Sequence, residues 1–430
     1  MNELIPSVVL TASFALASLC GTQEVAAGEK GGAALALRAR KIVTCSFEGA
    51  QAVDDGVLIV RDGKIVAVGP ASEVALPVDC RYVDVGDSWL VPGFIDLHCH
   101  CAGPDLFSGK NDINDVVYVT QPEQRVGAAV TLGNNALKLA VAGGVTTVLF
   151  IPGSGSNCGG QGVLLKTGFE RWDDALVRDP GSLKVAQWGN PENYLGGVGK
   201  TWENWHLRQM FRQGAAYARS WSEHDAGRAP KPRKDLRFDV FRELAAKRTQ
   251  VSVHTQVYQV VLMTITMIRG EFGLDTYIDH GEWAGYLTAP LAQKMGVNAI
   301  IGPREIETPT GRFFDTDGQI QGIAAEYQKR GHTMIGFNTD SPVVEEHQLF
   351  LQAAVACRYG FDATENQGLR GLTIVPAITA GIADRVGSLE PGKDADVLVV
   401  TGNPLDPRTA VEQVLIEGRN VYQAAQGRRF

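Results

Sequence analysis

The sequence predicts a (β/α)8 barrel accompanied by a small β-sandwich domain that the N- and C-terminal segments build together. Two observations support this fold class. Short apolar strands alternate with helical periods through the middle of the chain, and hairpin-like alternation flanks that middle on both sides. A chain of 430 residues, 44% of them hydrophobic and 20% charged, can bury a core of this size.

Two segments near the chain ends have the pattern of antiparallel strands. Residues 54–70 alternate apolar and polar side chains around an Asp-Gly pair, which is typical of a two-residue hairpin turn. Residues 387–403 and 410–423 have the same character. Because these segments flank the middle of the chain, we expect residues 28–90 and 385–430 to form one composite β domain.

The middle of the chain, residues 91–384, has the pattern of repeated β–α units. Helix-like periods at 128–144, 239–248 and 346–360 separate several short strands, which implies parallel βαβ units. An open doubly wound sheet is the alternative, but no GxGxxG follows a first strand. We therefore predict a barrel with an eighth, less regular strand between His100 and Gly144. The seven clearer strand candidates are 93–100, 144–153, 183–189, 250–256, 276–281, 298–303 and 333–340.

One segment interrupts the alternation of strands and helices. Residues 190–236 are too long for an ordinary βα loop. We interpret them in part as an insertion at the catalytic rim of the barrel, where long loops commonly shape a substrate pocket.

Residues 1–27 have the pattern of a signal peptide. An apolar run at 5–21 precedes small residues, although no basic residue precedes the run. The run is shorter than the ~20 apolar residues that a membrane span needs, so we expect no stable membrane span. We therefore expect export to the periplasm or the extracellular space, with a cytoplasmic location as the alternative.

Composition excludes several classes of protein. The net charge of −8 argues against a general nucleic-acid surface, which needs clustered Lys and Arg. The seven cysteines are scattered and form no CxxC pair, which argues against a disulfide framework and a structural zinc finger. Cys99 is expected in the core, and Cys101 and Cys158 lie either near a site or buried without a role.

The stretch GFIDLHCH, residues 93–100, ends in two histidines one residue apart. In a strand His98 and His100 face one side, whereas Leu97 and Cys99 face the other. This pair alone fits two metal ligands or two partly solvated histidines equally well. The remaining strands decide between these interpretations.

Further polar residues follow the carboxyl ends of the predicted strands, where barrels carry their chemistry. A single histidine there is more often a core residue that donates to backbone, but that explanation is poor for the whole set. Four neutral imidazoles and a carboxylate are suitable ligands for zinc or a similar divalent ion. The residues at these strand ends are His98, His100, Lys184, His254, His280 and Asp340.

Asp340 has two further possible roles. A carboxylate beside a metal-bound water can take its proton, since the metal lowers the pKa of that water to ~7. Asp340 can also cap a following helix, because the sequence TDSP begins a turn. The two roles are compatible.

These residues together resemble the amidohydrolase superfamily of metal-dependent hydrolases. The likeness covers nearly all the chain after the leader, and it implies a (β/α)8 barrel with a small β domain from both termini. The branch it resembles most is imidazolonepropionase-like or prolidase-like, through residues 152–166 and 183–197. The motifs that carry the likeness are VPGFIDLHCH (91–100), AGGVTTV (142–148), VSVHTQ (251–256), YIDHGE (277–282), FNTDSP (337–342) and the tail at 377–406.

The resemblance also implies roles for individual residues. It places metal ligands at His98, His100, His254, His280 and Asp340. Many members carry a carboxylated lysine that bridges two metals, and Lys184 occupies that place. An unmodified lysine beside a single metal is the alternative, and Lys166 is the competing lysine. The implied cofactor is one or two divalent ions per chain, with Zn²⁺ expected.

The leading functional hypothesis is a hydrolase that cleaves an amide, cyclic amide or dipeptide-like C–N bond by metal-activated hydroxide. Asp340 would bind metal and carry the proton, and Arg304 would either orient a substrate carboxylate or form a surface ion pair. The alternatives are a mononuclear deaminase of an amino-heterocycle and a catalytically inactive binding or scaffold relative. We expect a small-molecule substrate, no nucleic acid, and possible homo-oligomers.

Overall fold

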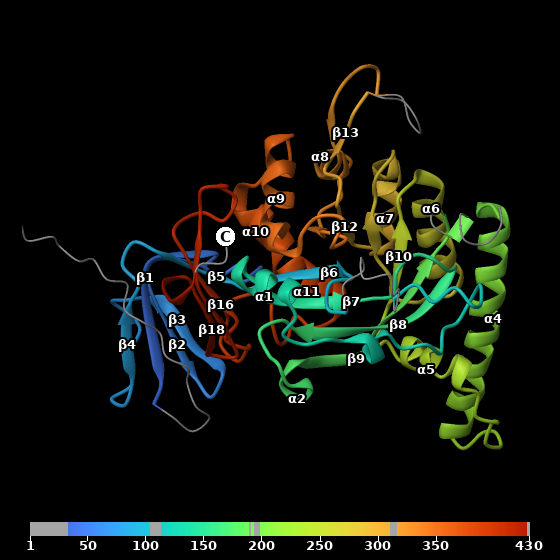
Figure 1. The fold of residues 1–430 in the computed structure, drawn as a ribbon, viewed down its shortest axis with the longest axis horizontal. Helices are drawn as coiled ribbons and strands as arrows, with labels where there is room; N and C mark the ends of the chain where they lie inside the picture. Colours follow the sequence, from blue (N-terminus) through green and yellow to red (C-terminus); the bar gives the residue numbers. More distant parts are fainter. Residues whose placement is uncertain (1–32, 104–112, 189–190, 193–197, 310–315, 428–430) are drawn as a thin grey trace, which may run out of the picture.

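The computed structural model describes residues 33–103, 113–188, 191–192, 198–309 and 316–427 (Figure 1). The predicted signal peptide, residues 1–27, lies outside the described residues, so export stays a prediction. None of the helices in the described ranges is long and apolar enough to cross a membrane.

One sheet combines strands from both ends of the chain. Its hydrogen-bonded order is β18-β17-β16-β5-β1-β2-β3, and β4 also pairs with β1. Figure 1 shows these strands, blue and red, side by side at one end of the molecule. The bounds are β1 Leu35–Val43, β2 Ala52–Arg61, β3 Lys64–Pro70, β4 Arg81–Asp84, β5 Trp89–Pro92, β16 Val397–Val400, β17 Val411–Ile416 and β18 Arg419–Gln423.

The hairpins in this sheet follow from local turn chemistry. Asp62 and Gly63 join β2 to β3 with φ values of 52° and 78°, and Glu417 and Gly418 join β17 to β18 with φ values of 50° and 70°. Two successive positive φ angles match the right-handed twist of the flanking strands. The hairpin predicted within residues 54–70 is therefore confirmed.

A second eight-stranded sheet forms a nearly closed barrel in the order β15-β12-β11-β10-β9-β8-β7-β6. The backbone N–H of His100 donates to the carbonyl of Ser341 at 2.9 Å, which brings the two ends of this order together. The barrel strands are β6 Phe94–Cys99, β7 Val145–Phe150, β8 Cys158–Lys166, β9 Leu176–Ala186, β10 Val251–Thr255, β11 Ile278–His280, β12 Ala299–Ile301 and β15 Ile335–Phe337.

The eighth barrel strand corrects the sequence prediction. Seven predicted strands are present, but the eighth is β8 and does not lie between His100 and Gly144. It pairs antiparallel with both β7 and β9, so the barrel is mixed and not wholly parallel. A tight antiparallel meander needs no crossover helix, which explains why no helical period precedes β8.

Helices cover the outside of the barrel. Two amphipathic stretches predicted at 128–144 and 346–360 form α1 and α9, and Asn134 caps α1 by accepting from the N–H of Leu137. The main helices are α1 Asn135–Ala142, α4 Lys200–Asp225, α5 Val240–Ala245, α6 Tyr258–Met263, α7 Ala289–Met295, α8 Ile323–Lys329, α9 Leu349–Arg358, α10 Gln367–Leu372 and α11 Ile374–Ala380.

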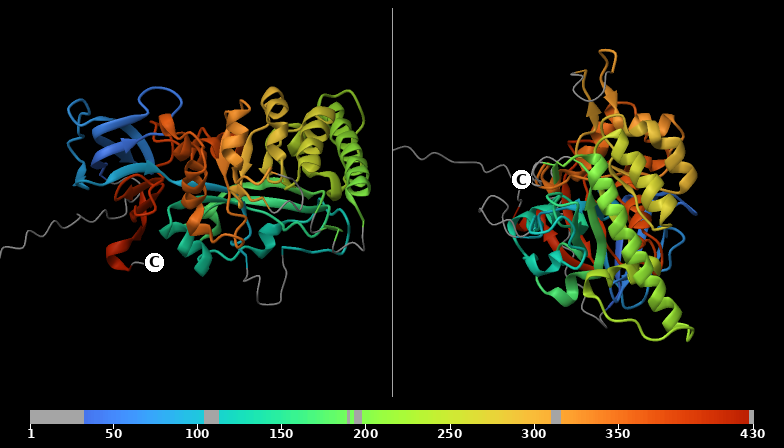
Figure 2. Two further views of the ribbon diagram at one scale, coloured as in Figure 1. Left: turned by 90° about the horizontal axis from the view of Figure 1, so that it is seen from above. Right: turned by 90° about the vertical axis from the view of Figure 1, so that its right-hand side faces the viewer.

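The long helix α4 lies at the end of the molecule opposite the terminal sheet (Figures 1 and 2). Its buried residues Leu207 and Phe211 join a core with Val185 of β9 and Val253 of β10. This part of the predicted insertion at 190–236 therefore covers the outer wall of the barrel. Residues 189–190 and 193–197 lie outside the described residues.

Buried ion pairs connect the barrel to the terminal segment. The ammonium of Lys166, at the end of β8, is 1% exposed and pairs with Asp396 and, at 3.3 Å, with Asp394. Lys64 and Arg385 approach Asp394 from the more exposed side at 2.6 and 3.1 Å. Because a buried ion pair is tolerated only when both charges are matched, this cluster fixes where the two sheets meet.

Replacing Lys166→Met should lower the free energy of unfolding by about 3–5 kcal/mol, because it leaves buried carboxylates without their shared cation. Urea unfolding followed by circular dichroism measures this. Lys64→Met is the matched control, since the Lys64 side chain is 48% exposed and its loss should cost no more than ~1 kcal/mol. Equal losses of unfolding free energy in the two variants would contradict the role given to the buried ion pairs of Lys166.

Candidate metal centre

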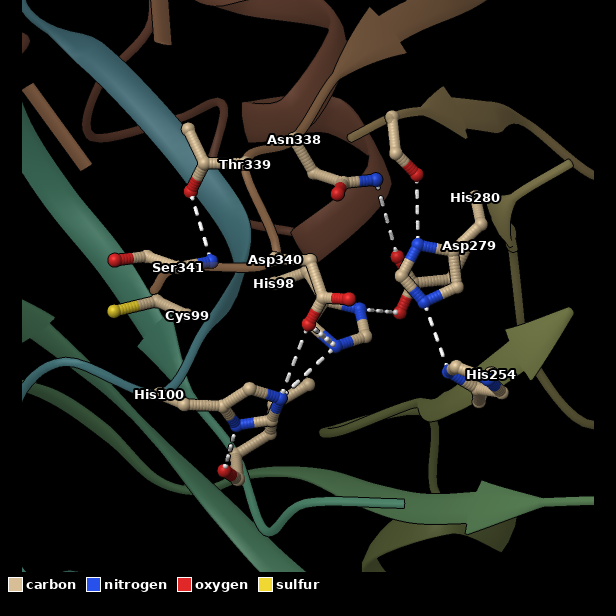
Figure 3. Close-up of polar contacts among 12 residues, drawn as sticks. His98, Cys99, His100, His254, Asp279, His280, Asn338, Thr339, Asp340 and Ser341 are labelled. Carbon is tan, nitrogen blue, oxygen red and sulfur yellow. Dashed lines mark hydrogen bonds and ion pairs between the residues drawn. The ribbon is translucent and has the colours of Figure 1, made fainter. Parts of the chain in front are cut away.

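The structure brings all six predicted ligands to one end of the barrel. His98 and Lys184 lie on β6 and β9, His254 on β10 and His280 on β11, each near the carboxyl end of its strand. His100 and Asp340 follow β6 and β15 directly. Because parallel strands end on the same rim, residues far apart in sequence converge there (Figure 3).

His98 lies at the middle of this group. Its Nε2 is 3.2 Å from His100 Nε2 and 3.1 Å from Asp340 Oδ1. The ammonium of Lys184 lies 3.2 Å from the same Nε2 atom. Ligand atoms of His98, His280 and Asp340 lie within 4.8 Å of one another, a spacing that one ion could span.

His254 and His280 form the other side of the group. His280 Nε2 is 2.9 Å from His254 Nδ1, and the His280 ring centroid is 4.5 Å from that of His98. Both rings are buried. Burial lowers the pKa of His254 to about 3 and that of His280 well below its usual value, so both are neutral and able to coordinate.

In His98, His100 and His280 the Nδ1 atom faces away from the centre and contacts a hydrogen-bond acceptor. A carbonyl or carboxylate can only accept, so each Nδ1 facing one carries a proton, and Nε2 is the nitrogen that faces the centre and can coordinate an ion in place of a proton. The contacts are His98 to Asp279 Oδ2 at 2.7 Å, His100 to the Ile151 carbonyl at 2.8 Å and His280 to the Gly302 carbonyl at 2.7 Å.

This arrangement fits a cation. The Nε2 atoms of His98 and His100 face each other at 3.2 Å, a distance that is favourable only when a proton or a metal ion lies between or beside them. Burial lowers the pKa of His98, but Asp279 and Asp340 outweigh it and raise that pKa to about 9. The centre therefore attracts positive charge. Its imidazole and carboxylate donors suit zinc and similar ions.

Lys184, and not Lys166, belongs to this centre. Lys166 is held by Asp394 and Asp396 where the barrel meets the terminal sheet. Lys184 is buried, and burial lowers its pKa to about 8 although Asp279 and Asp340 oppose the shift. A minor fraction of Lys184, roughly a tenth at pH 7, is therefore an uncharged amine, the form that can act as a nucleophile.

Asp340 and His280 carry backbone strain. Their φ values are 48° and 85°, in the left-handed region that non-glycine residues rarely adopt. Such strain costs of order 1–3 kcal/mol and persists where the surroundings fix a functional geometry. Burial raises the pKa of Asp340, but the neighbouring imidazoles of His98 and His100 outweigh it and hold that pKa well below its usual value.

Arg304 lies outside the ligand group. Its guanidinium pairs with both oxygens of Glu282, at 3.1 and 2.9 Å, and lies 5.2 Å from the Trp283 ring centroid. The Arg304 side chain is 48% exposed, whereas that of Glu282 is 1% exposed. The ion pair that the sequence left open is therefore present, and one side of Arg304 remains in solvent.

Two aspartates in the site were not predicted from the sequence. Asp279 holds His98, and Asp96 accepts from the His98 N–H at 2.8 Å and from the Thr339 hydroxyl at 2.6 Å. Asp279 comes directly before His280, and Asp96 lies two residues before His98. In the sequence each of these aspartates lies one or two residues before a histidine, and this spacing is the signal that could have identified them. The residue that each aspartate contacts becomes evident only in the structure.

Comparisons with known proteins agree with this geometry. The amidohydrolase family model matches residues 313–421. The amidohydrolase tasK of Hapsidospora irregularis is 26% identical over 85% of this chain, which spans 39% of that relative's length. The imidazolonepropionase of Pseudomonas putida (strain GB-1) is 23% identical over 80% of this chain and 87% of its own.

A solved structure agrees over a longer range. The crystal structure of an amidohydrolase from Thermotoga maritima MSB8 covers 90% of this chain and all of its own, with a TM-score of 0.78 and 27% identity. Together these matches support the amidohydrolase superfamily for this chain. The superfamily resemblance seen in the sequence is thereby confirmed, and an imidazolonepropionase is among the relatives.

Replacing Asp279→Asn should weaken Zn²⁺ binding by about 10–100-fold, because it removes the charge that orients His98 and increases its basicity. Competition with a chromogenic chelator measures the affinity. Asp275→Asn is the matched control, since Asp275 precedes the same strand but is 40% exposed and pairs with Arg269. An unchanged affinity in Asp279→Asn would show that Asp279 does not serve the centre.

Proposed function

We propose that this protein is a metal-dependent hydrolase of C–N bonds in a small amide, cyclic amide or dipeptide-like substrate. The observation that carries this is the convergence of four imidazoles, Lys184 and Asp340 on one buried rim. The amidohydrolase relatives support a hydrolase of C–N bonds as the broad class.

His98, His100, His254, His280 and Asp340 would hold the metal, with Lys184 beside them. A bound divalent ion supplies Lewis-acid activation of water and of the substrate carbonyl. The protein's own contribution begins with rigidity. Carbonyl and carboxylate acceptors hold Nδ1 of His98, His100 and His280. The Nε2 atoms of these rings therefore already point into the centre before an ion or substrate binds.

Lys184 would supply charge balance. Its uncharged amine can react with CO₂ to give a carbamate, which replaces a cation by an anion beside His98. Two divalent ions bring more positive charge than Asp340 alone can offset, so an added anionic oxygen pair favours a two-metal centre. The contact of 3.2 Å with His98 supports a place for this amine within the centre, and an unmodified lysine beside a single metal is the alternative.

Asp340 would move the proton. Its low pKa keeps it ionised, and its Oδ1 atom lies 3.1 Å from His98 and 3.4 Å from His100. From this position it can accept a proton from the attacking water and return it to the leaving nitrogen. This role rests on the position of Asp340, because a general base must first lie within reach of the proton that it takes.

Arg304 would recognise a substrate carboxylate. Glu282 holds one side of the guanidinium, and the exposed side can form a charge-assisted hydrogen bond. The Trp283 ring beneath it keeps the guanidinium plane in place. Substrates of the N-acyl amino acid or dipeptide type carry such a carboxylate.

The metal count tests the proposal first. Protein grown with added zinc and bicarbonate is compared with the double variant His98→Ala/His280→Ala by plasma mass spectrometry, and the difference counts the ions held at the centre. We expect a difference of two. A difference of one favours a mononuclear deaminase, and no difference overturns the proposal. His224→Ala, on α4, is the surface control.

Replacing Asp340→Asn should lower kcat by about 10²–10⁴-fold, because the amide cannot accept the proton. A panel of dipeptides, N-acyl amino acids and cyclic amides with product detection gives the rates. Metal content is measured in the same samples, so that loss of proton transfer is separated from loss of an ion. A kcat within threefold of wild type would remove Asp340 from this role.

Replacing Arg304→Met should raise KM about 10–100-fold for substrates with a free carboxylate, because the substrate loses one charge-assisted hydrogen bond to the guanidinium. The matching substrate with that carboxylate amidated should show no change. The fold should persist, because burial raises the pKa of Glu282 to about 8 and lets it take up a proton when its partner is removed. Equal effects on both substrates would contradict carboxylate recognition.

A further inference from the structure

A second group of donor atoms lies on the other side of the strand end that carries His98 and His100. Cys99 and Cys101 alternate with these histidines, and in Figure 3 the Cys99 sulfur points away from the two rings. The Sγ atoms of Cys99 and Cys101 are 3.1 Å apart, and Cys101 Sγ is 3.6 Å from Glu346 Oε2. All three donor atoms lie within 4.8 Å of one another.

The thiol cluster, Cys99, Cys101 and Glu346, is buried and lacks a balancing cation. The three residues are 0%, 8% and 2% exposed. Oε1 of Glu346 has no hydrogen-bond partner, and no lysine or arginine of the described ranges pairs with this carboxylate. A buried polar atom without a partner costs about 1–3 kcal/mol, so the cluster would gain from a ligand that interacts with oxygen and sulfur together.

The chemistry of these donors differs from that of the histidine centre. Two thiolates and a carboxylate suit zinc and softer divalent ions, whereas imidazole and carboxylate oxygen accept a wider range of metals. Zn–S bonds of about 2.3 Å in tetrahedral geometry place two sulfurs ~3.8 Å apart. The two sulfurs would therefore separate by about 0.7 Å, which small side-chain rotations supply.

We propose that Cys99, Cys101 and Glu346 form a second metal site that takes a thiophilic divalent cation such as Zn²⁺. Binding forms two sulfur–metal bonds and one oxygen–metal bond and releases the two thiol protons to solvent, together with the carboxyl proton when Glu346 carries one. A water or a neighbouring oxygen completes the coordination.

The position of this site gives it a structural role. Glu346 begins the turn that leads into α9, and Cys99 ends β6. An ion bound between Glu346 and the two cysteines would connect the end of β6 to the start of α9. It would thereby hold in place the backbone segment that carries His98 and His100. The site is independent of the hydrolase proposal, since none of its ligands belongs to the histidine centre.

Cobalt tests this site directly in the full chain. Co²⁺ bound by thiolate gives a near-ultraviolet charge-transfer band, which imidazole and carboxylate ligands do not give. We expect this band in wild type, its loss in Cys101→Ser, and at least tenfold weaker Co²⁺ binding in Glu346→Gln. Cys357→Ser is the matched control, because Cys357 is half-buried on α9 and outside the cluster.

The proposal is overturned if folded wild type gives no charge-transfer band or if the band survives in Cys101→Ser. It is also overturned if the wild-type mass is two daltons below that of the fully reduced chain and no metal is bound to the thiols. The last result would assign the pair to a disulfide. Should Cys101→Ser fail to fold, the near-isosteric Glu346→Gln still decides, because unchanged affinity there excludes the site. Visible cobalt bands from the histidine centre report separately on the hydrolase proposal.

Discussion

The meeting of the first and last barrel strands is the constraint on which the candidate centre depends. Asp96 of β6 accepts from both the N–H and the hydroxyl of Thr339, and the His100 N–H donates to Ser341. These bonds place Asp340 beside His98 of β6 and His100, which follows that strand. Without this closure a carboxylate from the end of the barrel would have no fixed relation to imidazoles from its beginning.

Electrostatics inside this closed rim follows from burial. Groups of both signs lie close together and largely buried, so each charge is stabilised mainly by a close neighbour. Asp279 therefore raises the proton affinity of His98, whereas His254 and His280, which have no such carboxylate, remain neutral. Chemically identical side chains thus differ in state because one aspartate is placed beside one ring.

Much of the centre could be predicted from the sequence because its residues share one rule, the end of a parallel strand. That rule identified all six residues which the structure brings together. The same rule did not identify β8. Glycines at 159, 160 and 162 interrupt the apolar pattern expected of a strand, and β8 pairs antiparallel with its neighbours. The rule could not find the contact of Asp279 with His98, since no local pattern encodes a partner from a distant strand.

The pairing of β16 with β5 constrains the order in which the molecule can assemble. Pro92 ends β5 and Phe94 begins β6, so the histidine strand is attached to a strand whose neighbour on one side is β16, from the other end of the sequence. During synthesis the early strands emerge long before β16 does, and domains form as their parts become available. A chain that ends before residue 397 would therefore carry every predicted ligand, but the strand that leads into His98 and His100 would lack its β16 neighbour.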